Sequence, residues 1–90
     1  MYNEILELEE YCKKIGVIVH KETFLDGYCL KFNNGGDVVQ HRGSYGCNCG
    51  CVEFGYTGFK KTDFKATTLP CAKSFIYRHR TELNEATGNE

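Results

Sequence analysis

The chain has 90 residues, of which 41% are hydrophobic and 26% charged, and its formal net charge at pH 7 is −1. This length fits one domain, and such fractions argue against intrinsic disorder. No repeat, low-complexity tract or linker divides the sequence, so a single domain over residues 1–90 is expected. The near-neutral net charge points to no class of partner by itself.

The amino-terminal segment reads MYNEILELEEYCKK, with neither a basic start nor an apolar run. It therefore does not resemble a signal peptide, and no stretch of the chain reaches transmembrane length. We expect a cytoplasmic protein without a membrane partner. In that reducing compartment the six cysteines would be free thiols or metal ligands and not disulfides.

The first expected element is a helix over residues 3–15. Asn3 can cap its amino end, and Gly16 suits the left-handed position that follows a helix. Apolar residues recur at helical spacing and form one stripe, made of Ile5, Leu8, Cys12 and Ile15.

Four strands are expected next, at Val17–Lys21, Tyr28–Phe32, Val38–Arg42 and Cys51–Tyr56. Asp26-Gly27 marks a turn after the first strand. Asn33 to Gly36 mark a tight turn after the second, because Asn and Gly tolerate positive φ. The glycine-rich segment 43–50 reads as a hairpin loop. Short connections of this kind predict an antiparallel β-meander.

A second helix is expected to open at Thr68-Leu69-Pro70, since proline is tolerated in a first turn. Residues 57–67 read as a loop or an irregular edge, and the tail should fray from Glu85. The buried stripe of this helix would be Ala72, Phe75, Ile76, His79 and Leu83. The fold class is therefore α+β: an N-terminal helix, a four-stranded antiparallel meander and a C-terminal helix packed on one sheet face.

The most distinctive segment is HRGSYGCNCGC, residues 41–51. On an extended chain the sulfurs of Cys47, Cys49 and Cys51 would share a face, which suggests a zinc site. A fourth ligand would have to come from elsewhere in the fold, from His41, Cys29 or Cys71. The usual paired ligand spacings are absent from the sequence. The alternative has Cys51 as a small core residue and the other two as loop thiols.

The same segment offers groups that could contact a partner. His41 and Arg42 end the third strand, where adjacent residues point to opposite faces, so at most one of them faces a given site. Ser44 and Tyr45 could hydrogen-bond a partner from the loop. Alternatively, Ser44 caps a turn and Tyr45 packs over the sheet end. Glu53 would be either a buried carboxylate paired with His41 or Arg42, or an exposed rim residue.

The segment from Gly36 to Glu53 resembles a pattern in small phage- and prophage-encoded proteins. In that pattern a strand with a basic end runs into S-Y-G, three variable residues, a glycine and then an acid three residues later. The matching residues are Ser44, Tyr45, Gly46, Gly50 and Glu53. Cys47 and Cys49 fall at variable positions, and His41 stands where an arginine is usual.

The resemblance covers about a fifth of the chain. It implies a phage accessory protein of uncharacterised role, acting in the host cytoplasm. Many phage proteins of this size bind and block host machinery, including restriction and CRISPR defences. An anti-defence role, for example as an anti-CRISPR protein, is what the resemblance implies.

Charge is unevenly distributed along the chain. Residues 1–26 hold six acids and three lysines, whereas residues 60–80 hold one acid, Asp63, among six bases. Aromatic residues interleave with those bases, a combination typical of single-stranded nucleic-acid binding. A protein partner could use the same face, and two ordinary solvated helix faces would also explain it. The bases are Lys60, Lys61, Lys65, Lys73, Arg78 and Arg80.

No phosphate-binding, metalloprotease or nucleophile-elbow motif is present in the sequence. A Cys–His pair formed in space stays open as a catalytic alternative. The leading hypothesis is a non-enzymatic protein that binds a host protein or protein–nucleic-acid complex. The alternatives are a zinc-stabilised module and a nucleic-acid-binding domain. The partner-binding candidates are His41, Arg42, Ser44, Tyr45, Glu53, Lys60, Lys61, Lys73, Arg78 and Arg80. No other cofactor is expected, and pairing of free sheet edges could form a homodimer.

Overall fold

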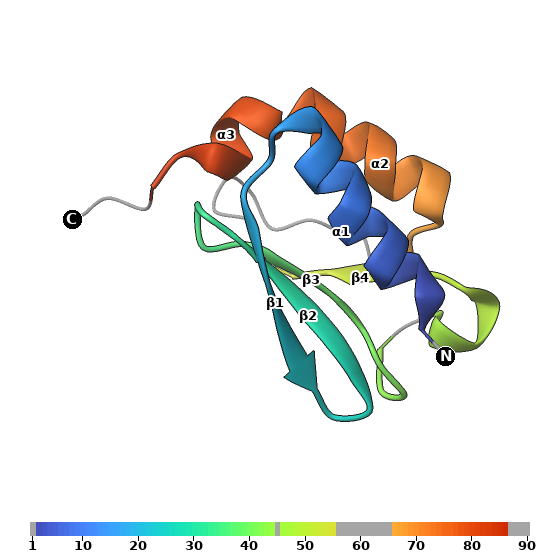
Figure 1. The fold of residues 1–90 in the computed structure, drawn as a ribbon. Helices are drawn as coiled ribbons and strands as arrows, with labels where there is room; N and C mark the ends of the chain where they lie inside the picture. The colour runs from blue at the N-terminus through green and yellow to red at the C-terminus, as the bar shows by residue number, and fades with distance from the viewer. Residues whose placement is uncertain (1, 45, 56–65, 87–90) are drawn as a thin grey trace.

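The computed structural model describes residues 2–44, 46–55 and 66–86. Its elements, in chain order, are α1 (Asn3–Ile15), β1 (Val19–Phe24), β2 (Gly27–Phe32), β3 (Asp37–Gln40), the 3₁₀ turn η1 (Cys47–Cys49), β4 (Glu53–Phe54), α2 (Leu69–Arg78) and α3 (Arg80–Asn84). The strands form one antiparallel sheet in the order β1-β2-β3-β4. Figure 1 shows the helices on one side of this sheet, which confirms the predicted α+β meander.

The core lies between the helices and the covered sheet face. Its fully buried side chains come from α1, from β2 and β3, from the bridge before β4 and from the two C-terminal helices: Ile5, Leu8, Cys12, Leu30, Val38, Val52, Ala72, Ile76 and Leu83. The rings of Phe54 in β4 and Phe75 in α2 meet edge to face, 5.0 Å apart. This contact ties α2 to the last strand of the sheet.

Helix α1 has the predicted bounds but a different amino-terminal cap. Asn3 is already helical, the capping position is Tyr2, and no side-chain cap bond is made there. The side chain of Gln40, from β3, takes over this role. Its Oε1 accepts the N–H of Ile5 at 2.9 Å, and its Nε2 donates to Glu4 Oε1 at 3.0 Å. The predicted cap by Asn3 is therefore wrong, since the acceptor comes from the sheet.

The carboxyl end of α1 is as the sequence predicts, with Gly16 at φ 82°. Residues 16–18 are then fastened to α3 by one side chain. Asn84 Oδ1 accepts the N–H of Ile18 at 2.7 Å, and Asn84 Nδ2 donates to the carbonyl of Gly16 at 2.8 Å. The β2–β3 turn joins the same cluster, since Asn33 Nδ2 donates to the Asn84 carbonyl at 2.8 Å. One end of the sheet is thus closed by α3.

Strand bounds differ from the expected ones for local reasons. β1 begins later and runs to Phe24, so the turn is centred on Leu25 and Asp26 and not on Asp26-Gly27. β3 ends at Gln40, because the N–H of His41 donates to Ser44 Oγ at 3.1 Å instead of to a strand. β4 has only two residues, preceded by a single bridge between Val52 and Thr67.

The expected C-terminal helix is divided into α2 and α3 at His79, whose φ and ψ of −111° and 20° are not helical. Hydrogen bonds cross the junction, from His79 N to the Phe75 carbonyl and from Leu83 N to the His79 carbonyl. Most of the expected irregular segment 57–67 and the end of the tail lie outside the described residues. Within the described ranges, no helix has the length and apolar character needed to cross a membrane.

Candidate functional site

The end of the sheet away from α3 carries a compact exposed feature, the tip of the β1–β2 hairpin. Phe24 pairs with Gly27, and Leu25 and Asp26 form the two-residue turn between them. Two adjacent apolar side chains are exposed here, Phe24 at 47% and Leu25 at 60%. Leu25 also has a φ of 55°, in the left-handed region that bulky residues avoid. A protein that only needed a turn would gain from a small polar residue or glycine at this position.

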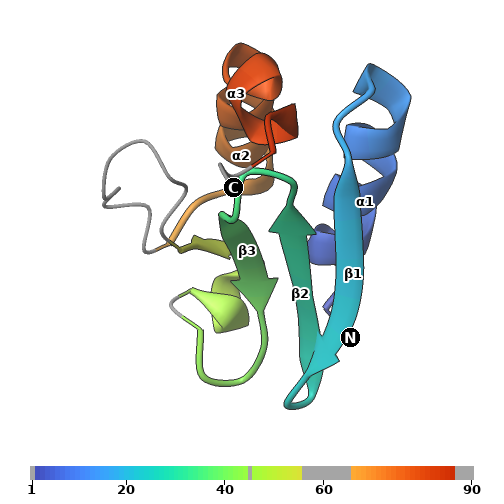
Figure 2. The ribbon, with the colours of Figure 1, turned by 90° about the vertical axis from the view of Figure 1, so that its left-hand side faces the viewer.

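Asp26 fastens the hairpin tip to two other parts of the chain. Its Oδ1 accepts the backbone N–H of Arg42 at 2.9 Å, and its Oδ2 accepts the hydroxyl proton of Tyr2 at 2.8 Å. The N–H of Arg42 is the main cause of the lowered pKa of Asp26, and the same carboxylate raises the pKa of Tyr2. The tip is thus held against residues 41–44, and Figure 2 shows this segment beside the hairpin turn.

His41 is buried against this tip. Its ring meets the ring of Phe24 edge on, with centroids 5.0 Å apart. Its Nδ1 accepts the N–H of Gly43 at 2.9 Å, so the neutral ring carries its proton on Nε2. Gly27 permits this packing, because a Cβ there would lie 1.9 Å from the Gln40 carbonyl oxygen. We define the tip surface as Phe24, Leu25, Asp26, His41 and Arg42.

Ser44 is buried, and its side chain forms hydrogen bonds within the loop. Its Oγ donates to the His41 carbonyl at 2.9 Å and accepts the His41 N–H at 3.1 Å. The interpretation in which Ser44 caps a turn is therefore the one found in the structure. Arg42 is exposed and directly follows His41. Tyr45, the neighbouring candidate, lies outside the described residues.

The cysteine cluster does not have the extended geometry on which the zinc hypothesis depended. Cys47 to Cys49 form the turn η1, bracketed by Gly46 at φ 78° and Gly50 at φ 73°. The alternation that would place the sulfurs on one face is therefore absent, and Cys51 is buried. Within residues 2–44, 46–55 and 66–86, no group of three or more His, Cys, Asp or Glu side chains is arranged to hold a metal ion.

Both bracketing glycines also make close contacts. A Cβ on Gly46 would lie 2.7 Å from the Cβ of Cys51, and one on Gly50 would lie 2.9 Å from Glu4 Oε2. The loop is therefore packed against the amino end of α1, close to the cap that Gln40 provides.

Glu53 is half-buried on β4. It pairs with Val39 across β3 and β4, on the sheet face that the helices leave uncovered. Its predicted pairing with His41 or Arg42 stays a prediction. This face holds a hollow of about 320 Å³ lined by Glu22, Phe24, Cys29, Lys31, Asp37 and Val39. Burial raises the pKa of Asp37 in this hollow, and Lys31 opposes the rise.

The basic candidates of the C-terminal region are partly engaged within the molecule. Lys73 Nζ lies 2.8 Å from Glu7 Oε2. The guanidinium of Arg80 stacks 4.0 Å from the ring centre of Tyr77. Arg78 is exposed at the end of α2. Lys60 and Lys61 lie outside the described residues, so the structure does not bring the six bases together as one described surface.

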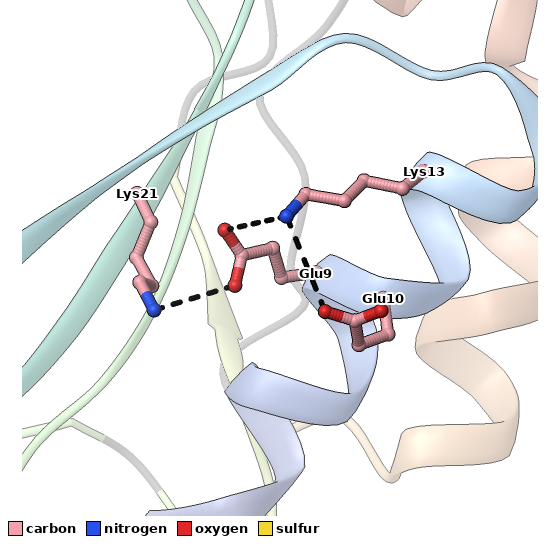
Figure 3. A network of polar contacts seen from close by, with 4 residues as sticks. All are labelled: Glu9, Glu10, Lys13 and Lys21. Atoms are coloured by element: carbon pink, nitrogen blue, oxygen red, sulfur yellow. Dashed lines mark ion pairs between the residues drawn. The ribbon is translucent and has the colours of Figure 1, made fainter.

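The acids of the amino-terminal region also have partners. Figure 3 shows Glu9 on α1 between two lysines, with its Oε1 3.4 Å from Lys21 Nζ and its Oε2 3.7 Å from Lys13 Nζ. Lys13 also lies 4.0 Å from a carboxylate oxygen of Glu10. The uneven charge seen along the sequence is therefore partly neutralised in space, across α1, β1 and α2.

No match was found when the chain was compared with models of protein families, with curated proteins and with solved structures.

No sequence motif marked Phe24 and Leu25 as a candidate site. A signal was available: two adjacent apolar residues directly precede Asp26-Gly27, where a turn is normally polar. Gln40 was also missed, and no local pattern could reveal it, because the N–H that it accepts belongs to a residue 35 positions away.

Proposed function

We propose that this chain is a small non-enzymatic binding protein of phage type, which contacts a protein of the host through the tip surface. The observation that carries the proposal is the pair Phe24 and Leu25, exposed side by side on a tip that Asp26 holds in place. Large apolar side chains on a fixed scaffold suit an interface, because little conformational entropy is lost on binding. Such a protein could block a component of the host's defence machinery.

Backbone strain supports the same interpretation. A bulky residue in the left-handed region costs roughly 1–2 kcal/mol relative to its ordinary conformations. Leu25 adopts this conformation while leaving most of its side chain in water, so the folded chain gains little from it in return. Strain of this kind is concentrated at functional sites. Contact with a partner would provide the burial that the isolated chain does not.

The contacts of His41 favour a scaffold role over catalysis. Its Nδ1 accepts a backbone N–H and its ring packs against Phe24, so both hold the tip surface in shape. Burial raises the pKa of the Cys29 thiol and raises that of Cys12 to about 12, which makes both poor nucleophiles.

The test is capture of a host protein by the tagged full chain, followed by affinity measurement on the captured protein. The variant Leu25→Asn removes the apolar side chain but keeps a residue that tolerates positive φ. We expect it to weaken binding about fivefold or more, equivalent to about 1 kcal/mol at an interface contact. Ile18→Asn is the matched control, because Ile18 is 48% exposed and lies at the α3 end of the sheet. Its affinity should match that of the wild type.

A second variant pair separates the tip from the basic helices. If Arg78→Ala with Arg80→Ala abolishes capture while Leu25→Asn binds normally, the contact lies on α2 and α3, and the tip proposal is wrong.

A further inference from the structure

The hollow on the uncovered sheet face adjoins the tip surface, because Phe24 belongs to both. The strand register places its residues in two rows. In the first row, Glu22, Cys29 and Val39 are cross-strand neighbours on β1, β2 and β3. In the second row, two residues further along, Lys31 on β2 pairs with Asp37 on β3. Cys29 is buried and Val39 is half-buried, so the floor is apolar and the charged groups form the rim.

Among the described residues that line the hollow, the rim has more negative than positive charge. Lys31 is the only base in that described set, and its Nζ lies 3.5 Å from Glu22 Oε1. Asp37 therefore shares a single ammonium group with Glu22. Because Asp37 is also half-buried, a second cation beside it would lower the free energy of its charged form. The hollow thus combines an apolar floor, one aromatic wall and an excess carboxylate.

We propose that this hollow receives a lysine or arginine side chain of the protein bound at the tip surface. The inference rests on the proposed function, since the same partner would contact Phe24 at the tip and in the hollow. The aliphatic stem of the basic side chain would cover Cys29 and Val39 beside the Phe24 ring, and its charged head would lie between Glu22 and Asp37. Long basic side chains bind in this manner because their stems are apolar and only their heads are charged.

The test is a nuclear magnetic resonance titration of the isotope-labelled full chain with N-acetyl-lysine methylamide and with its arginine counterpart. N-acetyl-norleucine methylamide, which has an apolar stem without the charge, is the matched probe. We expect the amide signals of residues 22, 29, 31, 37 and 39 to shift with the basic probes at millimolar concentrations. The norleucine probe should bind about two- to fivefold more weakly, the ratio expected of one charge pair near a surface.

Variants of the chain locate the binding. Asp37→Asn and, independently, Glu22→Gln, whose side chain is 56% exposed, should each weaken the lysine probe by about two- to fivefold. Glu10→Gln is the control, since that side chain is 76% exposed on α1 and should leave the affinity unchanged. Equal shifts with lysine and norleucine, or shifts away from the hollow, would overturn the inference.

The two proposals can fail separately. Leu25→Asn should leave the probe affinity unchanged, because Leu25 does not line the hollow. Leu25→Asn could abolish capture of the host protein while Asp37→Asn and Glu22→Gln leave capture unchanged. In that case the tip proposal stands, and the proposal that the hollow receives a basic side chain is wrong. If the probe binds in the hollow but Leu25→Asn captures the host protein normally, the proposed function is wrong instead.

Discussion

Gln40 joins the amino end of α1 to the strand that leads into the tip surface, so its replacement tests how that surface is held. The side chain is 1% exposed and makes two hydrogen bonds, one to the N–H of Ile5 and one to the carboxylate of Glu4. In Gln40→Leu the volume is nearly kept but the Ile5 N–H loses its acceptor. A buried unsatisfied donor costs about 1–3 kcal/mol, and loss of a helix cap costs a similar amount.

We therefore expect Gln40→Leu to lower the free energy of unfolding by about 2 kcal/mol, less than the sum because both figures describe the same N–H group. For a domain of this size that corresponds to a melting temperature lower by roughly 8–16 °C. Urea unfolding followed by circular dichroism measures the first quantity, and a thermal scan measures the second. A change below about 0.5 kcal/mol would refute the assignment of Gln40 as the cap of α1.

The variant Gln40→Glu should make the stability of the fold depend on pH. The new carboxylate still accepts the Ile5 N–H, but it replaces the donor that lies 3.0 Å from Glu4 Oε1. The two like charges raise the pKa of the pair in the folded state, so the folded chain binds more protons than the unfolded one. The stability of the variant should therefore recover as the pH falls through the carboxyl range, by about 1.4 kcal/mol for each unit of pKa rise. The exchanged pair Glu4→Gln with Gln40→Glu is the control and should remain stable at neutral pH.

Three further outcomes follow from other contacts. Asn84→Ala removes two hydrogen bonds to residues 16–18 and should destabilise the fold by about 1–3 kcal/mol in the same urea assay. Leu25→Gly removes the strain of a positive φ at a side chain that is mostly exposed, so the free energy of unfolding should stay equal or rise by up to about 1.5 kcal/mol. A clear decrease would contradict the inference that Leu25 is strained. Alkylation followed by mass spectrometry should modify exposed Cys49 and Cys71 first and Cys12 only on unfolding.

The elements predicted correctly are those whose signals are local. The bounds of α1 follow from its apolar stripe and from Gly16, whose φ of 82° is the conformation that the sequence predicts. The meander follows from turns of Asn, Asp and Gly. The predicted β1–β2 turn is displaced by one residue. The sequence favours a turn at Asp26-Gly27, because Asp-Gly commonly forms turns. In the structure the turn is Leu25-Asp26, with Leu25 at a positive φ that is unusual for leucine.

The errors in the site come from contacts between segments distant in sequence, or from competition within a loop. His41 and Arg42 were expected at the end of a strand, but Ser44 Oγ takes the N–H that a strand would use. The cysteines were expected to alternate on an extended chain, but glycines on either side of η1 adopt left-handed conformations and close a 3₁₀ turn. Neither the Ser44 hydrogen bond nor the 3₁₀ turn produces a periodic pattern that can be recognised in the sequence.

The residues that match the phage-like pattern and the exposed apolar residues of the tip surface occupy neighbouring but different positions, and the structure supplies a physical reason. Ser44, Gly46 and Gly50 are used internally, by hydrogen bonds to His41 and by close approach to Cys51 and Glu4. A motif made of such residues specifies the shape of a loop and not what the loop binds. Phe24 and Leu25 lie outside the pattern, on a hairpin that this loop supports through Arg42 and Asp26. In this chain the shape of the loop and the apolar tip are therefore specified by different residues.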